Sequence, residues 1–233
     1  MDCPPVNALR VAEWFELAET LGRLSDDPSV RVVVLAADGK GFNAGVDIKE
    51  MQETAGFQAL VGANRGCAAA FAAVYDCGVP VIAAVHGYCL GGGVGLAGNA
   101  DIVVASDDAW FSLPEVDRGA LGAATHLGRL VPQQRVRALM YLAEKVTAAE
   151  LQQYGTVWKV VPPAELRAAA LEVAAAVAAK SPAVIRAAKA SLNGIDPVDV
   201  KRSYRYEQGF TFELNLTGVA DEHRDAFVER RER

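Results

Sequence analysis

The sequence is poor in the residues that bind metals or link chain segments through disulfides. Among its 233 residues there are four cysteines and three histidines. No two cysteines have CxxC spacing, and no cluster of histidines accompanies them, so we expect no metal site. We expect the cysteines to be free and to behave as small buried hydrophobes. That use of cysteine is typical of a reducing compartment such as the cytoplasm.

Long apolar runs and a strong charge of one sign are also missing. No uncharged apolar stretch reaches the roughly 18 residues of a membrane span, and the start MDCPP has no basic or apolar run of a secretory signal. The net charge of −6 disfavours nucleic acid or an anionic membrane as the main partner. A small anionic ligand needs only local positive charge, so it stays possible. The remaining composition is that of an ordinary globular protein.

Apolar patterning predicts a mixed fold. Four short runs of apolar and β-branched residues predict strands, at residues 30–36, 79–85, 101–105 and 110–111. Apart from Arg31 and Asp101, the first three are apolar throughout, which indicates a parallel or otherwise covered sheet. Helices are predicted at residues 7–24 with Asn7 as cap, at 57–75, from Pro132 onward, and at 164–179, 182–192 and 197–216. This order favours an α/β core followed by a helical C-terminal third.

Four glycines in the stretch LGGGVGL, residues 90–96, lie between a predicted strand and a predicted helix. The first turn of a helix has N–H groups without partners inside the helix, and glycines let a ligand approach them. The stretch therefore indicates an anion or oxyanion site, although close packing of backbone against backbone explains the glycines equally well. The spacing is not that of a dinucleotide-binding or P-loop motif.

A second irregular turn, at Gly45, Val46 and Asp47, also follows a predicted buried strand and enters a short helix. Two N–H groups from two such turns can converge on one carbonyl oxygen. That arrangement stabilises an enolate or a tetrahedral oxyanion, and each donor is worth about 10²–10³ in rate.

Taken together, these stretches resemble the crotonase (enoyl-CoA hydratase/isomerase) superfamily. The likeness is carried by GFNAGVDIKEM, by VPVIAAVHGYCLGGGVGLAGNADIVVASDDAWFSLPE, by GALGAATHLGRLVP and by an acidic-then-aromatic pattern at residues 222–227. It implies a spiral of ββα units, trimers or pairs of trimers, and acyl-CoA substrates, with coenzyme A as part of the substrate and no other cofactor. It also implies an oxyanion hole, which maps onto the N–H groups of Val46 and Gly92.

The resemblance assigns further residues to the site. The segment that lines the CoA arm corresponds to residues 46–49, and Gly91 and Gly93 flank the oxyanion hole. The predicted substrate-binding residues are Ala44, Val46, Asp47, Ile48, Lys49, Gly91, Gly92, Gly95 and His86. Lys49 is the first candidate to meet the CoA phosphates, with Lys189 or Arg202 as further possibilities from a neighbouring subunit.

Two histidines are weaker candidates for the site. His86 ends the strand before the glycines, so it could reach the cavity, but a histidine at a strand end more often satisfies a local hydrogen bond. The same two interpretations apply to His126, which lies at a predicted helix start.

The catalytic carboxylates depart from the pattern of the family's hydratases. Those enzymes carry two, and the first position is Gly95 in this sequence. The second is Glu115, which follows Leu113 and Pro114. We expect apolar surroundings to raise the pKa of Glu115 and to make it a general base or acid near neutral pH. We expect Gly95 to open space for a branched or ring-bearing acyl group.

One base, an oxyanion hole and room for water fit a hydrolytic reaction. Glu115 could activate water for attack on a β-keto acyl-CoA, with Val46 and Gly92 holding the departing thioester enolate in a retro-Claisen ring opening. Single-carboxylate hydration or isomerisation fits nearly as well, and a non-catalytic acyl-CoA-binding scaffold is the alternative of another class. The wording of FNAGVDIKEMQ, LPEVDRGALGAATHL and YEQGFTFELNLTGVADEHRDAF is similar to actinobacterial crotonase-type hydrolases that open the last steroid rings in cholesterol breakdown.

The ends of the chain complete the expectations. Residues 1–190 are predicted to form the crotonase core, and residues 191–233 a helical region that covers the site and the trimer interface. Its aromatic residues Tyr204, Tyr206, Phe210 and Phe212 are spaced for packing between subunits, and some could wall the acyl pocket. Chains of this family usually begin with a strand pair that is missing here, so we expect Met1 to be an internal methionine of a longer natural chain.

Overall fold

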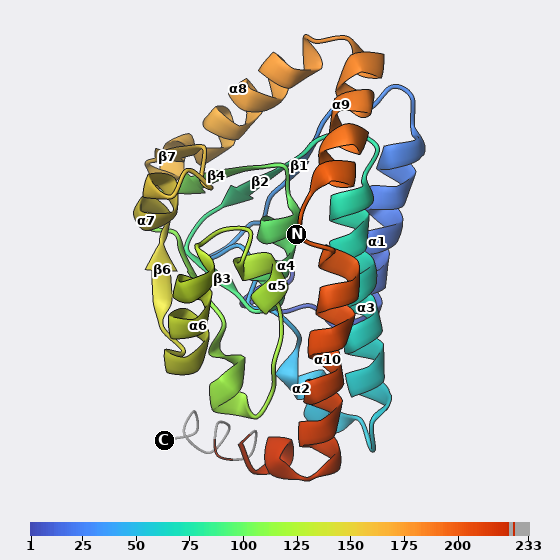
Figure 1. Ribbon diagram of the computed structural model, residues 1–233, viewed down its shortest axis with the longest axis vertical. Helices are drawn as coiled ribbons and strands as arrows, with labels where there is room; N and C mark the ends of the chain where they lie inside the picture. The colour runs from blue at the N-terminus through green and yellow to red at the C-terminus, as the bar shows by residue number, and fades with distance from the viewer. Residues whose placement is uncertain (224–225, 227–233) are drawn as a thin grey trace.

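The computed structural model describes residues 1–223 and residue 226 (Figure 1). The pattern expected at residues 222–227 lies partly outside the described residues. Within the described residues seven strands form two small sheets: β1 (Val33–Leu35), β2 (Val81–Val85), β3 (Tyr88–Leu90), β4 (Ile102–Ser106), β5 (Trp110–Ser112), β6 (Lys145–Thr147) and β7 (Lys159–Val161). The helices are α1 (Val11–Asp26), α2 (Ile48–Glu53), α3 (Gln58–Asp76), α4 (Gly92–Asn99), α5 (Ala124–Leu127), α6 (Gln133–Leu142), α7 (Ala148–Gln153), α8 (Leu166–Ala178), α9 (Pro182–Ile195) and α10 (Val200–Leu216), with 3-10 turns η1 (Pro114–Arg118) and η2 (Pro163–Glu165).

The larger sheet is parallel and has the strand order β1-β2-β4-β7. Its central strand β2 is buried along its whole length. Ile82 and Ala84 face the small apolar cluster under α8, whereas Val81, Ala83 and Val85 belong to the main core on the other face. Both faces are therefore covered, as the uniformly apolar strands predicted.

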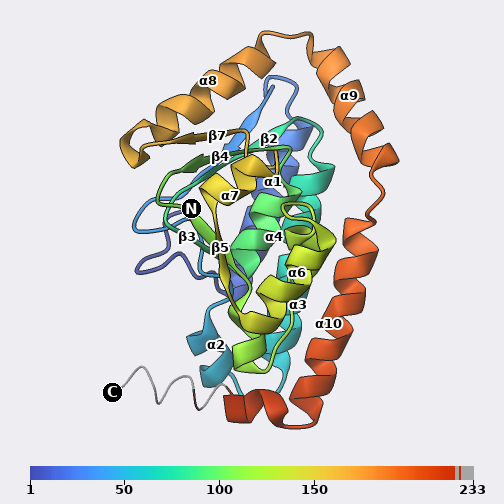
Figure 2. The same ribbon diagram turned by 60° about the vertical axis from the view of Figure 1, so that its left-hand side comes forward.

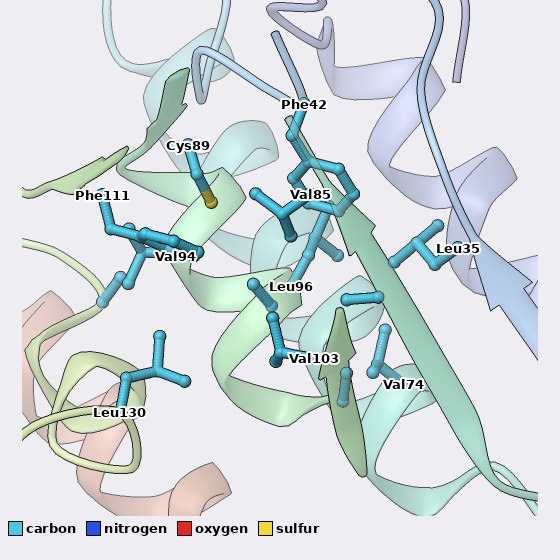
Figure 3. Packing of buried hydrophobic residues seen from close by; sticks show 14 of the residues in the cluster. Leu35, Phe42, Val74, Val85, Cys89, Val94, Leu96, Val103, Phe111 and Leu130 are labelled. Atoms are coloured by element: carbon cyan, nitrogen blue, oxygen red, sulfur yellow. The ribbon is translucent and has the colours of Figure 1, made fainter. Parts of the chain in front are cut away.

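The smaller sheet has the order β3-β5-β6, with β3 parallel and β6 antiparallel to β5. It lies beside α4, the helix that the glycine stretch begins. Every residue of α4 from Gly93 to Asn99 is buried. Figure 3 shows Val94 and Leu96 of this helix packed among Phe42, Val85 and Phe111. The glycine stretch thus lies in the centre of the molecule, where main-chain positions are held firmly by packing.

The C-terminal helices wrap around this core. Helix α8 covers the larger sheet, α9 runs back from the end of α8, and α10 runs alongside α3 (Figures 1 and 2). Lys189 of α9 is buried, and its ammonium group donates to the carbonyls of Val74 and Val79 and to Asp101 Oδ2 at 2.7 Å. This lysine links α9 to the core. Its role is therefore structural, and the suggestion that it meets the CoA phosphates is wrong for this fold.

Several element predictions need correction. Asn7 does not cap the first helix, because its side chain instead bonds the backbone of Cys3, Asp38 and Gly41, and the helix begins at Val11. The three-residue strands β3, β6 and β7 were not predicted. The other predicted strands and helices are present with ends shifted by up to four residues.

Two smaller findings concern the cysteines and the helices. All four cysteines are free, and Cys67, Cys77 and Cys89 are buried, as predicted. Within the described residues no single helix is long and apolar enough to cross a membrane, whereas the bent pair 163–178 and 182–195 passes on length and composition alone.

Candidate active site

The two turns singled out in the sequence meet at the start of α4. Gly45 adopts a left-handed φ of +86°, and a Cβ placed on it would lie 3.3 Å from the Gly92 nitrogen and 3.4 Å from the Leu90 carbonyl oxygen. Asn43 shapes the turn, because its Oδ1 accepts from the Gly45 N–H at 2.8 Å while its Nδ2 donates to the Asn7 carbonyl at 2.6 Å. The close approach of the two backbones accordingly requires glycine at position 45.

The backbone N–H groups of Val46 and Gly92 are not used by the fold. In the described part of the chain neither donates a hydrogen bond to a protein acceptor, although their neighbours do. Asp47 N–H donates to the Leu9 carbonyl at 2.9 Å, and Gly91 N–H donates to the Ser112 carbonyl at 3.1 Å. Val46 and Gly92 both line one pocket, so two unused donors are available to a ligand in it.

The glycines at the start of α4 also serve close packing. A Cβ on Gly92 would lie 2.7 Å from the Trp14 indole, and one on Gly93 would lie 2.7 Å from the Asn43 carbonyl oxygen. Gly91 has a φ of +51°, and a Cβ there would collide with the Glu115 carboxylate. Both interpretations of the glycine stretch therefore apply, since the same residues pack closely and leave an N–H group uncovered.

Glu115 is placed against Gly91 by the 3-10 turn η1. That turn begins at Pro114 and ends at Arg118, and the next residue, Gly119, has a φ of +65° that reverses the chain. The Oε2 atom of Glu115 is buried and has no hydrogen-bond partner among the described residues. Burial raises the pKa of Glu115 to about 8, against a smaller opposing effect of the Arg118 charge. Glu115 is consequently a base that can hold or release a proton near neutral pH.

The pocket in front of these groups is largely apolar. It encloses about 940 Å³ with its open mouth included. Its lining comes from the turns before α2 and α4, from α2, α3 and α10, and from η1 and the loop after it: Ala44, Gly45, Val46, Ile48, Met51, Leu60, Ala63, Asn64, Cys67, Leu90, Gly91, Gly92, Glu115, Arg118, Ala120, Leu121, Gly122, Ala123, Tyr204, Thr211 and Asn215. An apolar lining with a few polar groups suits a small organic group held by a few polar contacts.

The expectation that Gly95 widens the pocket is wrong. A Cβ at position 95 would collide with the ring of Phe71 on α3, and Gly95 does not belong to the pocket lining. That ring is held by edge-to-face or tilted contacts with Trp14 at 5.7 Å, His126 at 4.9 Å and Tyr204 at 5.1 Å between centroids. The place of a second carboxylate is therefore filled by an aromatic cluster.

Other predicted site residues lie outside the lining. His86 does not reach the pocket, because its Nε2 pairs with the Gly39 carbonyl at 3.0 Å, so the local hydrogen bond expected of a strand-end histidine is present. Asp47 caps α2 by accepting from the Lys49 N–H at 2.9 Å, and Lys49 is exposed on that helix. His126 is buried, and burial lowers its pKa to about 3, so it is neutral.

Sequence reasoning missed the α3 and α10 side of the site. Cys67 and Tyr204 both line the pocket. Thr211 lines it two turns further along the same face of α10. Only the aromatic spacing on α10 gave a signal in the sequence, and for Tyr204 the suggestion that such residues wall the pocket is confirmed.

Comparisons with known proteins agree with this geometry. A family model described as enoyl-CoA hydratase/isomerase matches residues 1–233, the whole chain. The chain therefore belongs to the enoyl-CoA hydratase/isomerase family and is an enzyme of the crotonase superfamily. Carnitinyl-CoA hydratase from Mycobacterium avium, a solved structure, matches with a TM-score of 0.86 and 28% identity over 99% of this chain and 90% of that one. The predicted crotonase-type fold is thereby confirmed.

Two curated relatives are much more similar to this chain in sequence. A protein of Rhodococcus jostii is 65% identical over 98% of this chain and 89% of its own length, and one of Mycobacterium tuberculosis is 62% identical over 99% and 93%. Both are named (7aS)-7a-methyl-1,5-dioxo-2,3,5,6,7,7a-hexahydro-1H-indene-carboxyl-CoA hydrolase. The carnitinyl-CoA dehydratase of Salmonella typhimurium is 33% identical over 88% of this chain and 80% of its own length.

Proposed function

We propose that this protein is a hydrolase that opens a ring of a cyclic β-keto acyl-CoA by carbon–carbon cleavage, in the degradation of the last steroid rings. The observation that carries the proposal is the placement of one buried carboxylate, Glu115, in the same pocket as the unused N–H groups of Val46 and Gly92. The names of the two close relatives, which describe a fused-ring diketone joined to CoA, support this class of substrate.

The reaction needs one base and one oxyanion site. Glu115 takes a proton from water, and the hydroxide adds to the ring ketone. The tetrahedral intermediate collapses, the bond between the ketone carbon and the thioester α-carbon breaks, and its electron pair forms the thioester enolate. The enolate oxygen accepts from the N–H groups of Val46 and Gly92. The protonated Glu115 then returns its proton to the α-carbon, leaving a ring-opened carboxylic acid and an intact thioester.

This scheme uses the groups that the pocket offers. Water supplies both the hydroxyl of the new carboxyl group and the proton on the α-carbon, so no cofactor beyond the CoA of the substrate is proposed. Phe71 occupies the place that a carboxylate at position 95 would need. Hydration with two carboxylates is therefore disfavoured, whereas hydration or isomerisation with Glu115 alone remains the second candidate because the same base can shuttle a proton between carbons of an enolate.

The test offers the enzyme a cyclic β-keto acyl-CoA and crotonyl-CoA and follows the products by mass. We expect the cyclic substrate to gain the mass of one water and crotonyl-CoA to react slowly. Glu115→Gln should lower the rate by at least about 10²-fold, and Asp117→Asn, an exposed carboxylate in the same turn, serves as the matched control. Fast hydration of crotonyl-CoA with the cyclic substrate untouched would support the second candidate. Equal turnover by wild type and Glu115→Gln would refute the catalytic role, and binding without turnover would favour a scaffold.

We also propose a homotrimer or a pair of trimers. Helices α9 and α10 expose large apolar side chains, a composition that favours burial between copies: Val184, Leu192, Ile195, Tyr206, Phe210 and Leu216. Sedimentation at several protein concentrations tests it, and a stable monomer would refute it. The free thiols support the cytoplasm as the proposed location.

A further inference from the structure

The loop that follows Glu115 forms one wall of the pocket. We call residues 119–124 the wall loop, of which residues 120–123 line the pocket. The Ala120 N–H donates to the Glu115 carbonyl at 3.0 Å, so the loop begins at the catalytic turn itself. Any movement of this loop would therefore change both the shape of the pocket and the position of Glu115.

Helix α10 holds the rest of the wall loop. Thr211 Oγ1 donates to the Leu121 carbonyl at 2.8 Å and accepts from the Leu121 N–H at 3.1 Å. At the far end, the Glu207 carboxylate accepts from the Ala124 N–H, at 3.1 Å to Oε1 and 3.2 Å to Oε2. These bonds tie the loop to a different helix at two points.

The far end of the wall loop has a conformation that needs such support. Ala123 has a φ of +62°, in the left-handed region that residues other than glycine rarely adopt. Ala123 immediately precedes Ala124, whose N–H donates to the Glu207 carboxylate. Glu207 is thus placed where it stabilises an otherwise unfavourable backbone conformation.

Glu207 also acts on Glu115 through its charge. The groups that bear on Glu115 are Arg118 on its own turn, Cys67 on α3, and Tyr204 and Glu207 on α10. Of these, Glu207 adds to the effect of burial, because a like charge disfavours ionisation of Glu115. Burial raises the pKa of Glu207 to about 7, so Glu207 is charged at the higher pH where Glu115 itself titrates.

We propose that Glu207 is a positioning residue, which holds the wall loop through the Ala124 N–H and strengthens Glu115 as a base through its negative charge. The proposal rests on the proposed function, since it needs Glu115 to be the base. It adds a role for α10, the helix that sequence reasoning had assigned to packing and to covering the site.

The experiment compares Glu207→Gln with wild type over a range of pH. A glutamine oxygen still accepts from Ala124, whereas the charge is lost. We expect the rising limb of kcat/KM for a cyclic β-keto acyl-CoA to move to lower pH by on the order of half a unit, with KM little changed. Glu213→Gln removes the same charge from an exposed position of α10, and its pH profile of kcat/KM should be that of the wild type. Thr211→Val loosens the loop without a change of charge and should raise KM without moving the limb.

A second readout does not depend on turnover. The ¹³C carboxyl signal of Glu115, identified by its loss in Glu115→Gln, should titrate at lower pH in Glu207→Gln than in wild type. An unmoved titration in Glu207→Gln overturns the proposal, as does an equal shift in Thr211→Val. If Glu115→Gln keeps its activity, the proposed function fails instead, and the titration still reports whether the two carboxylates are coupled.

Discussion

Replacing Glu115 by glutamine should make the protein more stable at alkaline pH while it abolishes activity. Burial raises the pKa of Glu115 from 4.5 in the unfolded chain to about 8 in the folded protein. The folded state therefore binds a proton that the unfolded state has released. Between those two pH values the wild type loses stability as the pH rises, and above about pH 8 the loss levels off. Glutamine has no such proton, so Glu115→Gln should not show this loss.

The size of the effect follows from the shift. One pKa unit corresponds to 1.36 kcal/mol, so the full penalty of ionising Glu115 in the folded state is about 5 kcal/mol at pH 9, as an order of magnitude. Near pH 4 the side chain at position 115 is mostly uncharged in the folded and the unfolded state of either protein. The stabilities of wild type and Glu115→Gln should therefore differ little there. The gain of the variant should therefore appear progressively between pH 4.5 and 8.

Urea unfolding at a series of pH values, at one protein concentration, measures this difference. Glu213→Gln serves as the control because its carboxylate is exposed on α10. A free-energy difference between wild type and Glu115→Gln that stays constant from pH 5 to pH 9 would refute the burial of a protonated Glu115. The same variants report the lost activity, so a stability gain together with inactivity identifies a group kept for catalysis at a cost to the fold.

Three further changes test the surroundings of the site. Phe71→Ala should cost about 3–5 kcal/mol in urea unfolding, because it empties the core beside Gly95, and a cost below about 1 kcal/mol would contradict the packing. Gly91→Ala should lower kcat by about 10²-fold or more with the fold retained by circular dichroism, since its Cβ would displace Glu115; wild-type kcat would contradict the contact. Lys189→Met should destabilise the chain by about 1–3 kcal/mol, because it removes the buried donor of the Val74 and Val79 carbonyls, without a change in KM; a raised KM would instead return Lys189 to substrate binding.

The sequence was sufficient for those parts of the site that depend on local backbone. The turn at Gly45 and the glycines before α4 are readable because each conformation demands glycine and each follows an apolar strand. Glu115 was found through its motif, and its raised pKa follows from the apolar residues beside it. Short three-residue strands such as β3 and β6 carry too little pattern to be recognised, since their pairing partners decide them.

Contacts between distant segments could not be read in the same way. Nothing in the local sequence of Gly95 reveals that Phe71 of another helix fills the space before it. The bond from Ala124 to Glu207 joins residues 83 positions apart. Asn7 looked like a helix cap because asparagine is a common cap residue. Its side chain is instead hydrogen bonded to three backbone groups of a neighbouring loop and turn. In each case a tertiary partner decided between two locally acceptable roles.

The missing second carboxylate and the raised basicity of Glu115 have a common physical origin. Phe71 fills the place beside Gly95, and its ring packs on Tyr204, which lines the pocket and bears on Glu115. Cys67 lies one helical turn before Phe71 on the same face of α3 and also lines the pocket. An aromatic and apolar wall therefore replaces a second charge, and the loss of solvent around Glu115 is what raises its pKa. A polar residue in place of Phe71 would then weaken the remaining base, so the pH limb of activity should move down together with the stability of the core.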